Sequence, residues 1–280
     1  MADWLQHDGV MAQKIRNHDW ASTSLGPLDG WPDVLKTTVA LVLASHFPQS
    51  IVWGEDLITL YNDGFVPILG TKPEALGRPF SDVWKEAWSE ISGIADDAFA
   101  GQATYIENFP LVIQRSVRPE LAYFTFCYSP IRDQFGQVVG MLNTVTETTA
   151  TVLMTQRLAV LDAIGSAVTE TSDPREIMQA TMGTLAGYLK VTHCAYADME
   201  DDEDGFFIRD NWLVEDATSL FGQYRLGDFG EGPLASLRAG QPLVINDIAS
   251  DLAPGVAATF RAFGIVSALC LPLIKGGKLT

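Results

Sequence analysis

The sequence predicts an α+β protein of two domains, each built on an antiparallel sheet with flanking helices. A chain of 280 residues is about twice the usual length of one domain. Short runs rich in β-forming residues, joined by turn signals, occur in both halves, which is typical of antiparallel sheets. A stretch of helical periodicity lies between them. The expected parts are an arm at 1–33, a first domain at 34–149, a linking helix at 150–172 and a second domain at 173–280.

The composition favours a globular protein and argues against two classes of partner. Hydrophobic residues make up 47% of the chain and charged residues 19%. The net charge of −17 repels phosphate backbones and anionic lipid, so we expect no nucleic-acid binding and no membrane association. The longest apolar run, Val39 to Phe47, is also too short to span a bilayer. Cys127, Cys194 and Cys270 lie far apart in apolar runs, which predicts buried free thiols in a reducing cytoplasm.

The N-terminal arm is predicted to be loops with a short helix. Its large apolar side chains, separated by Gly-Pro and Asp-Gly turn signals, should cover a face of the first domain; they are Trp20, Leu25, Leu28 and Trp31. His7 and His18 have no partner at metal-ligand spacing and are expected to be solvated. A helix should follow over Asp33–His46, preceded by Pro32 and with an acid in its first turn.

Five strands and three helical segments are expected in the first domain. The strands are Gln49–Gly54, Leu57–Asn62, Thr104–Gln114, Leu121–Ile131 and Gln137–Thr146. The first two should form a hairpin and the last three a meander, giving one antiparallel sheet with helices on one face. Asn62 or Asp63 can cap the first helical segment, and Gly70 can end it. The helical segments are Gly64–Leu69, Lys72–Leu76 and Trp84–Phe99.

This domain resembles a PAS sensor domain, most closely those of bacterial sensor histidine kinases of the HWE type. The stretches that carry the resemblance are Tyr61–Trp84, Tyr123–Gly140 and Val145–Thr149. In many PAS domains the last strand ends in an acidic residue followed by Thr, which connects the sheet to the outgoing helix. Glu147, Thr148 and Thr149 occupy that place here. The resemblance therefore implies that these residues relay movement of the sheet to the helix, since a carboxylate at such a junction can cap helix amides.

The PAS resemblance also bears on cofactors. A haem-binding PAS domain needs a histidine in its helical middle, and residues 64–120 contain none. A flavin photosensor of the LOV kind needs a Cys in an Asn-Cys-Arg context, whereas the domain has only Cys127. We therefore expect neither haem nor flavin. The aromatic residues should form the core or line a pocket for an unknown small organic ligand; the candidates are Trp53, Tyr61, Phe65, Phe124, Phe126 and Tyr128, beside Trp84 and Trp88.

Two arginines of the first domain, Arg115 and Arg118, flank a turn between strands. We expect them to be solvated surface charges, with contact to an anion as the alternative.

The linking helix carries an apolar seam. Met154, Leu158, Leu161 and Val168 follow a 3.5-residue spacing, with Gly165 in the one remaining position. This spacing suits a paired helix or a short parallel coiled coil. Only about two heptads are present, and an ordinary amphipathic helix packed on its own domain shows the same pattern. The place of the helix between two domains favours pairing, and hence a homodimer.

The second domain should begin with a helix from Asp173-Pro174 to Leu189. The acidic run Asp198–Asp204 is expected to be a solvated hairpin tip rather than a metal site, because it lacks the EF-hand spacing. The expected strands are Val191–Met199, Phe206–Val214, Pro242–Asp247 and Ala268–Ile274, with helices at Leu234–Arg238 and Ala257–Phe263.

These residues are similar to a GAF domain, on the evidence of Asp173-Pro174, Gly227–Ile248 and Phe260–Leu279. In GAF domains the turn corresponding to Gly276-Gly277 leads into a neighbouring strand. We expect that strand, the closing strands and an exit helix to lie beyond Thr280, so the chain should be a portion of a longer protein.

The GAF resemblance raises the question of a bilin. Bilin-binding GAF domains present a reactive Cys and an Asp-Ile-Pro motif. Asp247-Ile248-Ala249 matches that motif only in part, and Cys194 and Cys270 lie inside strands. We therefore expect no covalent bilin, and a cyclic-nucleotide pocket rests on analogy alone.

The sequence lacks the motifs of a free enzyme: it has no Ser-His-Asp ordering, P-loop, HExxH or CxxC. No H-box, ATP-binding box or Gly-rich lid of a histidine kinase occurs in residues 1–280. We therefore expect a sensory input region, without catalytic residues or a metal, of a cytoplasmic sensor histidine kinase. ATP binding and phosphorelay to a response regulator would belong to a downstream kinase domain. A diguanylate cyclase or phosphatase as the output, or a stand-alone ligand-binding module, are the alternatives.

Overall fold

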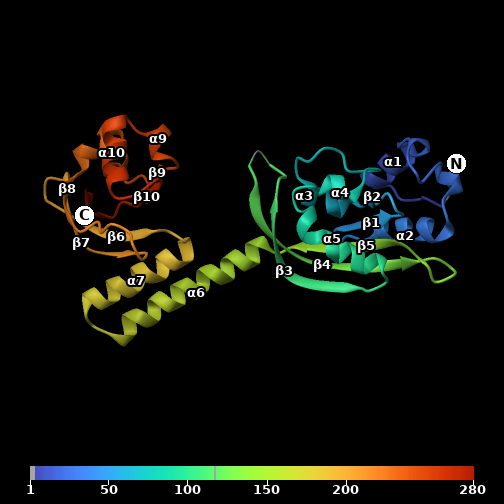
Figure 1. Ribbon diagram of the computed structural model, residues 1–280, viewed down its shortest axis with the longest axis horizontal. Helices are drawn as coiled ribbons and strands as arrows, with labels where there is room; N and C mark the ends of the chain where they lie inside the picture. The colour runs from blue at the N-terminus through green and yellow to red at the C-terminus, as the bar shows by residue number, and fades with distance from the viewer. Residues whose placement is uncertain (1–3, 117) are drawn as a thin grey trace. The chain divides into compact units, whose positions relative to one another are not determined.

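The computed structural model describes residues 4–116 and 118–280. The chain divides into two compact units, residues 1–155 and 156–280. In Figure 1 the first unit runs from blue to green and the second from yellow to red.

The first unit contains one five-stranded antiparallel sheet, as predicted. The spatial order of its strands is β2-β1-β5-β4-β3. The strand that comes last in the sequence therefore lies in the centre of the sheet. The strands are β1 (Gln49–Trp53), β2 (Ile58–Tyr61), β3 (Thr104–Ile113), β4 (Glu120–Arg132) and β5 (Val138–Glu147).

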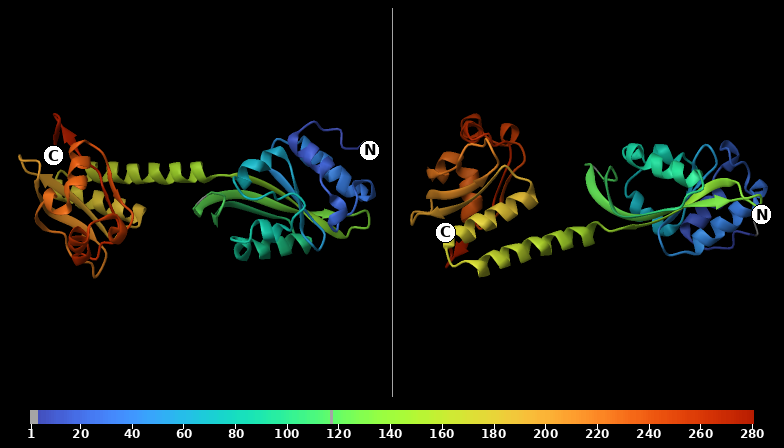
Figure 2. Two further views of the ribbon diagram at one scale, coloured as in Figure 1. Left: turned by 90° about the horizontal axis from the view of Figure 1, so that it is seen from above. Right: turned by 60° about the horizontal axis from the view of Figure 1, so that its bottom comes forward.

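Helices cover both faces of this sheet at one end and a single face at the other. Helix α5 (Trp88–Phe99) packs on β3, β4 and β5, whereas α2 (Asp33–Ala44) packs on β1 and β2. Figure 2 shows α5 and α2 on opposite faces. All four residues of β2 are buried, because that strand is covered from both sides. The prediction of helices on one face only was therefore wrong for β1 and β2.

The N-terminal arm packs against the same hydrophobic core as α2 and adds to the cover of the first unit. Trp20 and Trp31 are buried and meet edge to face, with ring centroids 5.0 Å apart. The arm contains α1 (Val10–Asn17) and the 3₁₀ turns η1 (Trp20–Ser22) and η2 (Leu28–Gly30). The expectation that its aromatic residues cover the first domain is confirmed for these two tryptophans.

The side chain of Asn62 joins three segments of the first unit. Asn62 is only 1% exposed. Its Oδ1 accepts hydrogen bonds from the amides of Gln49 and Phe65, at 3.0 and 3.1 Å. Its Nδ2 lies within hydrogen-bond distance of three carbonyls at the end of α2 and beyond, those of Val42, Ser45 and Phe47, at 3.0, 2.9 and 2.8 Å. The predicted cap at Asn62 is thus present.

The helical middle of this unit is more broken than predicted. It consists of the turn η3 (Asp63–Phe65) and helices α3 (Val66–Leu69), α4 (Phe80–Val83) and α5. The predicted helix at Lys72–Leu76 was wrong. The Gly77 amide donates to the Thr59 carbonyl at 2.9 Å, and the Thr59 amide donates to the Arg78 carbonyl at 2.9 Å. Residues 77–79 therefore lie alongside β2 in an extended conformation. The segment before them, residues 72–76, forms no helix.

The edge strand β3 contains a β-bulge. Its register against β4 shifts between Ile106 and Phe109, and Asn108 adopts a left-handed φ of 51°. The Asn108 amide donates to Thr125 Oγ1 at 3.1 Å rather than continuing the ladder. The strand is therefore interrupted halfway along.

Helix α6 (Thr149–Glu170) follows β5 after one residue. None of its residues is buried. Among the described residues, α6 alone is long and apolar enough to cross a membrane by length and composition. Arg157 and Asp162 lie in its middle, and each charge would cost about 2.5–3.5 kcal/mol at the centre of a bilayer. These charges argue against a membrane span.

The second unit contains three small sheets and two small hydrophobic cores. Helix α7 (Pro174–Leu189) is capped by Asp173 Oδ1 and packs on β6 and β7. The main sheet has the order β6-β7-β8. Its strands are β6 (His193–Met199), β7 (Gly205–Leu213) and β8 (Gly222–Arg225). The remaining strands are β9 (Leu243–Ile245), β10 (Ala268–Cys270), β11 (Ile274–Lys275) and β12 (Lys278–Leu279), and the helical segments are η4 (Leu226–Phe229), α8 (Glu231–Arg238), α9 (Ile248–Asp251) and α10 (Pro254–Ala262).

The expected strand Ala268–Ile274 ends at Cys270, so the second half of that prediction was wrong. The turn at Gly276 and Gly277 leads into a neighbouring strand, as expected, because Ile274 pairs with Leu279 across it. Both glycines have left-handed φ angles, 58° and 84°, which allow so tight a turn.

Candidate functional site: an aromatic cavity and the junction with helix α6

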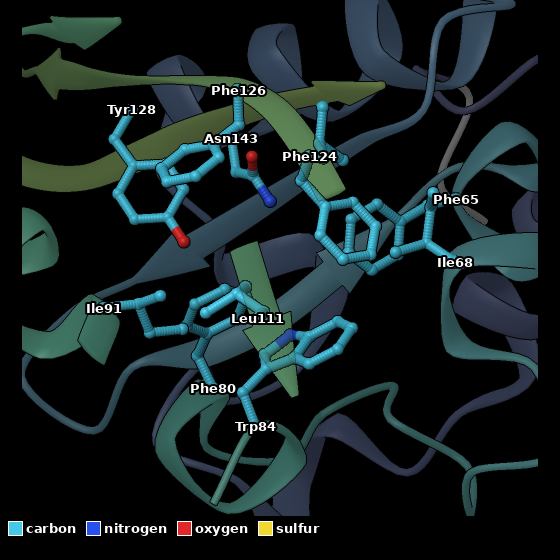
Figure 3. Close-up of a pocket in the computed structure, with 11 residues that line it drawn as sticks. Phe65, Ile68, Phe80, Trp84, Ile91, Leu111, Phe124, Phe126, Tyr128 and Asn143 are labelled. Atoms are coloured by element: carbon cyan, nitrogen blue, oxygen red, sulfur yellow. The ribbon is translucent and has the colours of Figure 1, made fainter. Parts of the chain in front are cut away.

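The first unit encloses a small aromatic cavity between its sheet and the helices α3, α4 and α5 (Figure 3). Its volume is about 30 Å³, which is space on the scale of a water molecule. The lining comes from seven elements, η3, α3, α4, α5, β3, β4 and β5, and from Trp84 directly after α4. The three strands contribute their inward-facing residues, which alternate with solvent-facing ones. The lining residues are Phe65, Ile68, Phe80, Trp84, Ile91, Leu111, Phe124, Phe126, Tyr128, Asn143 and Val145.

Three polar groups line this otherwise apolar cavity. Within the described part of the chain, Trp84 Nε1 and Asn143 Oδ1 are buried and have no hydrogen-bond partner. Asn143 Nδ2 donates to Ser50 Oγ at 3.2 Å, which fixes the orientation of the amide. Tyr128 is buried, and Figure 3 shows its hydroxyl and the Asn143 amide facing the cavity. Burial raises the pKa of Tyr128 further above neutral pH, so its hydroxyl stays protonated and uncharged.

The cavity therefore presents donors and acceptors to an uncharged molecule. Trp84 offers an N–H, Asn143 offers a carbonyl oxygen, and the Tyr128 hydroxyl can act as either. Unpaired buried polar groups are costly, so a ligand or water that bonds to them would be stabilised. A flat molecule with one donor and one acceptor matches this arrangement.

Four of the six predicted pocket residues line this cavity: Phe65, Phe124, Phe126 and Tyr128. Trp53 and Tyr61 lie outside it. Trp53 occupies space left by Gly140, where an added Cβ would lie 3.1 Å from Trp53 Cε3. Tyr61 donates its hydroxyl hydrogen to Glu74. Asn143, whose amide is one of the three polar groups of the cavity, was not predicted. A single polar residue in a strand carries no local signal of a binding site.

An ion pair supports the wall of the cavity behind Trp84. The side chains of Lys72 and Glu86 are 8% and 17% exposed and form a salt bridge. Lys72 Nζ lies 4.9 Å from the centroid of the Trp84 ring, a cation–π contact. Burial raises the pKa of Glu86, but hydrogen bonds from Lys72 and from the Gln114 amide outweigh it and hold the pKa below its usual value.

The junction between β5 and α6 is held by Arg115. Its Nη1 and Nη2 donate to the two carboxylate oxygens of Glu147 at 2.6 and 2.8 Å, and its Nε donates to Glu120 at 2.5 Å. Such bidentate pairs are among the stronger side-chain contacts. The prediction that Arg115 is a solvated surface charge was therefore wrong. The hydrogen bonds from Arg115 outweigh burial and lower the pKa of Glu147.

Glu147 and Thr149 connect this ion pair to the first turn of α6. Thr149 Oγ1 donates to Glu147 at 2.8 Å and accepts from the Tyr123 amide at 2.9 Å. The Thr148 amide donates to the Tyr123 carbonyl at 2.8 Å, and the Thr148 carbonyl accepts from Val152 in the helix. The three residues predicted to relay movement thus lie where sheet and helix are bonded to each other.

Two contacts also join Arg115 to the wall of the cavity. Helix α3, which carries Ile68, ends at Gly70, and the next residue, Thr71, donates both its amide and its hydroxyl to the Arg115 carbonyl. A Cβ on Gly70 would lie 2.8 Å from that carbonyl oxygen, so the approach requires glycine. The neighbouring Gln114 amide donates to Glu86 at 3.1 Å.

In the second unit the acidic run is bonded internally. Asp202 accepts hydrogen bonds from the amides of Asp204 and Gly205, and both aspartates pair with Arg225. No group of three or more His, Cys, Asp or Glu side chains is placed to hold a metal ion in residues 4–116 and 118–280.

The three cysteines are free but half-buried rather than fully buried. Burial raises the pKa of Cys194 and of Cys270, which lowers the fraction of reactive thiolate in each.

Comparisons with solved structures find weak similarities. The chromophore-binding domain of a Stigmatella aurantiaca bacteriophytochrome is 13% identical over 84% of this chain and 83% of that one, with a TM-score of 0.39. The phycoerythrobilin-bound GAF domain of a cyanobacterial phytochrome is 16% identical over 45% of this chain and 78% of that one, with a TM-score of 0.38. The PAS domain of Bordetella pertussis BvgS is 15% identical over 46% of this chain and 98% of that one, with a TM-score of 0.31.

The curated proteins include no significant match to the chain. The five-stranded antiparallel sheet of the first unit is consistent with the PAS resemblance of the sequence. The family model of the GAF domain matches residues 173–280, in agreement with the GAF resemblance of the sequence.

Proposed function

We propose that this chain is the sensory input region of a cytoplasmic signal-transduction histidine kinase, with the kinase domain outside residues 1–280. The PAS-like unit takes up a small uncharged ligand in its aromatic cavity. The single observation that carries the proposal is the pair of unpartnered polar atoms, Trp84 Nε1 and Asn143 Oδ1, in an apolar enclosure.

The proposal includes a route from the ligand to the helix. A ligand larger than water must move the walls of the cavity outward, because the present space is so small. The walls include α3, whose end is bonded to Arg115 through Thr71. Arg115 in turn holds Glu147 at the start of α6. Movement of the wall is thereby passed to α6, through which the chain forms a homodimer.

Binding of benzimidazole tests the cavity. This flat molecule has one N–H and one acceptor nitrogen, which complement Asn143 and Trp84. We expect saturable binding that shifts the Trp84 indole N–H signal in a ¹H–¹⁵N spectrum, with toluene as a control that lacks polar groups. Asn143→Leu should weaken binding about tenfold, since one hydrogen bond is lost. An unchanged Trp84 signal at saturating benzimidazole would contradict the proposal.

The same preparation tests for a chromophore. One of the similar solved structures is a GAF domain with bound phycoerythrobilin. A visible absorption band in the purified chain would indicate a bound pigment and would contradict the proposal of a colourless, uncharged ligand. We expect absorption in the ultraviolet only.

Replacing Arg115 should change how stability depends on pH. Because the pKa of Glu147 is lowered in the folded state, its stabilising contribution is complete above the unfolded pKa of about 4.3 and is lost as the pH falls through the lower folded value. Arg115→Gln removes this contribution, so the variant should be about 1 kcal/mol less stable at pH ~7 and should lose less stability on acidification.

Urea unfolding at pH ~7 and at pH ~3 measures this difference. Arg118→Gln is the matched control, since Arg118 is exposed and forms no ion pair with any residue placed in the structure. Equal acid dependence in Arg115→Gln and in the unmodified chain would exclude the proposed role of the ion pair.

A further inference from the structure

Helix α6 presents an uncovered apolar stripe. Met154, Leu158, Leu161 and Val168 are 57%, 58%, 55% and 49% exposed. They recur at spacings of four, three and seven residues, which places them along one side of the helix. Four large apolar side chains in one line are not expected to remain in water.

The charges of α6 lie beside this stripe. Arg157 and Asp162 are the only charged residues between Thr149 and Thr169. Both are exposed, and neither forms an ion pair within the part of the chain that the structure describes. If Met154, Leu161 and Val168 occupy d positions of a heptad and Leu158 an a position, Arg157 falls at g and Asp162 at the following e.

We infer that α6 binds the α6 of a second copy of this chain, parallel and in register, with Arg157 of each copy facing Asp162 of the other. In a parallel coiled coil the g residue of one helix lies beside the e residue five positions further along the other. The two charged residues of this helix have that spacing and opposite signs. This inference rests on the proposed function, in which α6 carries the signal, and it specifies the partner and its orientation.

An antiparallel pair does not explain the charges. In that arrangement g residues face g residues and e residues face e residues, so Arg157 and Asp162 would not meet. The twofold symmetry of a parallel dimer instead forms the pair twice. Charges at e and g positions are known to select partner and orientation more than to add stability.

A charge-reversal cycle tests the orientation. Arg157→Glu or Asp162→Lys alone places like charges opposite each other twice in each dimer, and each should raise the dimer dissociation constant about tenfold in sedimentation equilibrium. The double variant Arg157→Glu with Asp162→Lys should return it to within about twofold of the unmodified chain. Gln156→Glu and Ala163→Lys, at f positions on the far side of the helix, each add one charge of the same sign as the corresponding reversal. They are the controls for a charge away from the seam and should have no effect.

Two further variants test the stripe. Leu158→Glu with Leu161→Glu should make the chain monomeric, because charges would be buried in the seam. Gly165→Leu should strengthen the dimer, because it fills the one empty seam position and a Cβ at Gly165 meets no atom within 4 Å. Gly165→Ala separates this gain from the effect of helix propensity.

Several results would overturn the inference. They are a monomer at all concentrations, an unchanged mass for Leu158→Glu with Leu161→Glu, a double reversal no better than the single ones, or flotation of the chain with anionic or neutral vesicles. Benzimidazole binding to the cavity is measured separately and in the monomeric variant too. Failure of the dimer is thus distinguishable from failure of the proposed sensory function.

Discussion

Replacing Asn62 with alanine should lower the free energy of unfolding of the first unit by about 4 kcal/mol. The substitution removes a buried amide that serves two backbone N–H groups and three carbonyls. At about 1 kcal/mol for each lost bond, the sum approaches the stability of a small domain. We expect the first unit to unfold at much lower urea concentration.

Tryptophan fluorescence measures this effect selectively. Of the seven tryptophans, only Trp212 lies beyond residue 155, so the signal reports chiefly on the first unit, whereas a whole-chain probe would mix two transitions. Asn143→Ala is the matched control: its amide forms one hydrogen bond, to Ser50, and it should cost about 1–2 kcal/mol. A loss below about 1 kcal/mol for Asn62→Ala would show that water replaces the amide.

Replacing Lys72 with methionine should destabilise the first unit by about 3 kcal/mol. Methionine keeps much of the apolar stem, but Glu86 is left as an unpaired carboxylate in a site that is 17% exposed. The variant also loses the cation–π contact with Trp84 and the hydrogen bond to the Val83 carbonyl. The same fluorescence-detected unfolding measures the loss.

The double variant Lys72→Met with Glu86→Leu separates the ion pair from packing. Removing both charges should restore most of the stability, because two apolar side chains carry no desolvation penalty. If the double variant is as unstable as the single one, the contribution of Lys72 comes from its contacts with Trp84 and Val83 and not from the charge of Glu86.

Local patterns predict the strands of the first unit well. Alternating apolar residues in β4 and β5 and the glycine turn between them depend on neighbours in the sequence. The cap at Asn62 is equally local, since the Phe65 amide lies three residues on.

Long-range contacts explain the failures. The segment Lys72–Leu76 has a proline and a glutamate where a helix would begin, but Lys72 is bonded to Glu86 and Glu74 to Tyr61. These partners lie 14 and 13 residues away, and the backbone after them pairs with β2. Local propensity is overridden by such contacts.

Arg115 illustrates the same limit at the candidate site. Its carboxylate partner Glu147 is 32 residues away, and no spacing rule joins an arginine in a loop to the end of a strand. Only the order of the strands in the sheet, with β4 between β3 and β5, brings their ends together. Asn143 likewise becomes distinctive only when the wall around it is known.

The bulge in β3 bears on how copies of this chain aggregate. An open edge strand offers a row of amides and carbonyls on which another strand can grow, the first step toward fibrils. Here the row is broken at Asn108, where φ is 51°, and Pro110 has no amide hydrogen to offer. Even at high concentration, copies of the chain should therefore resist edge-to-edge polymerisation through β3.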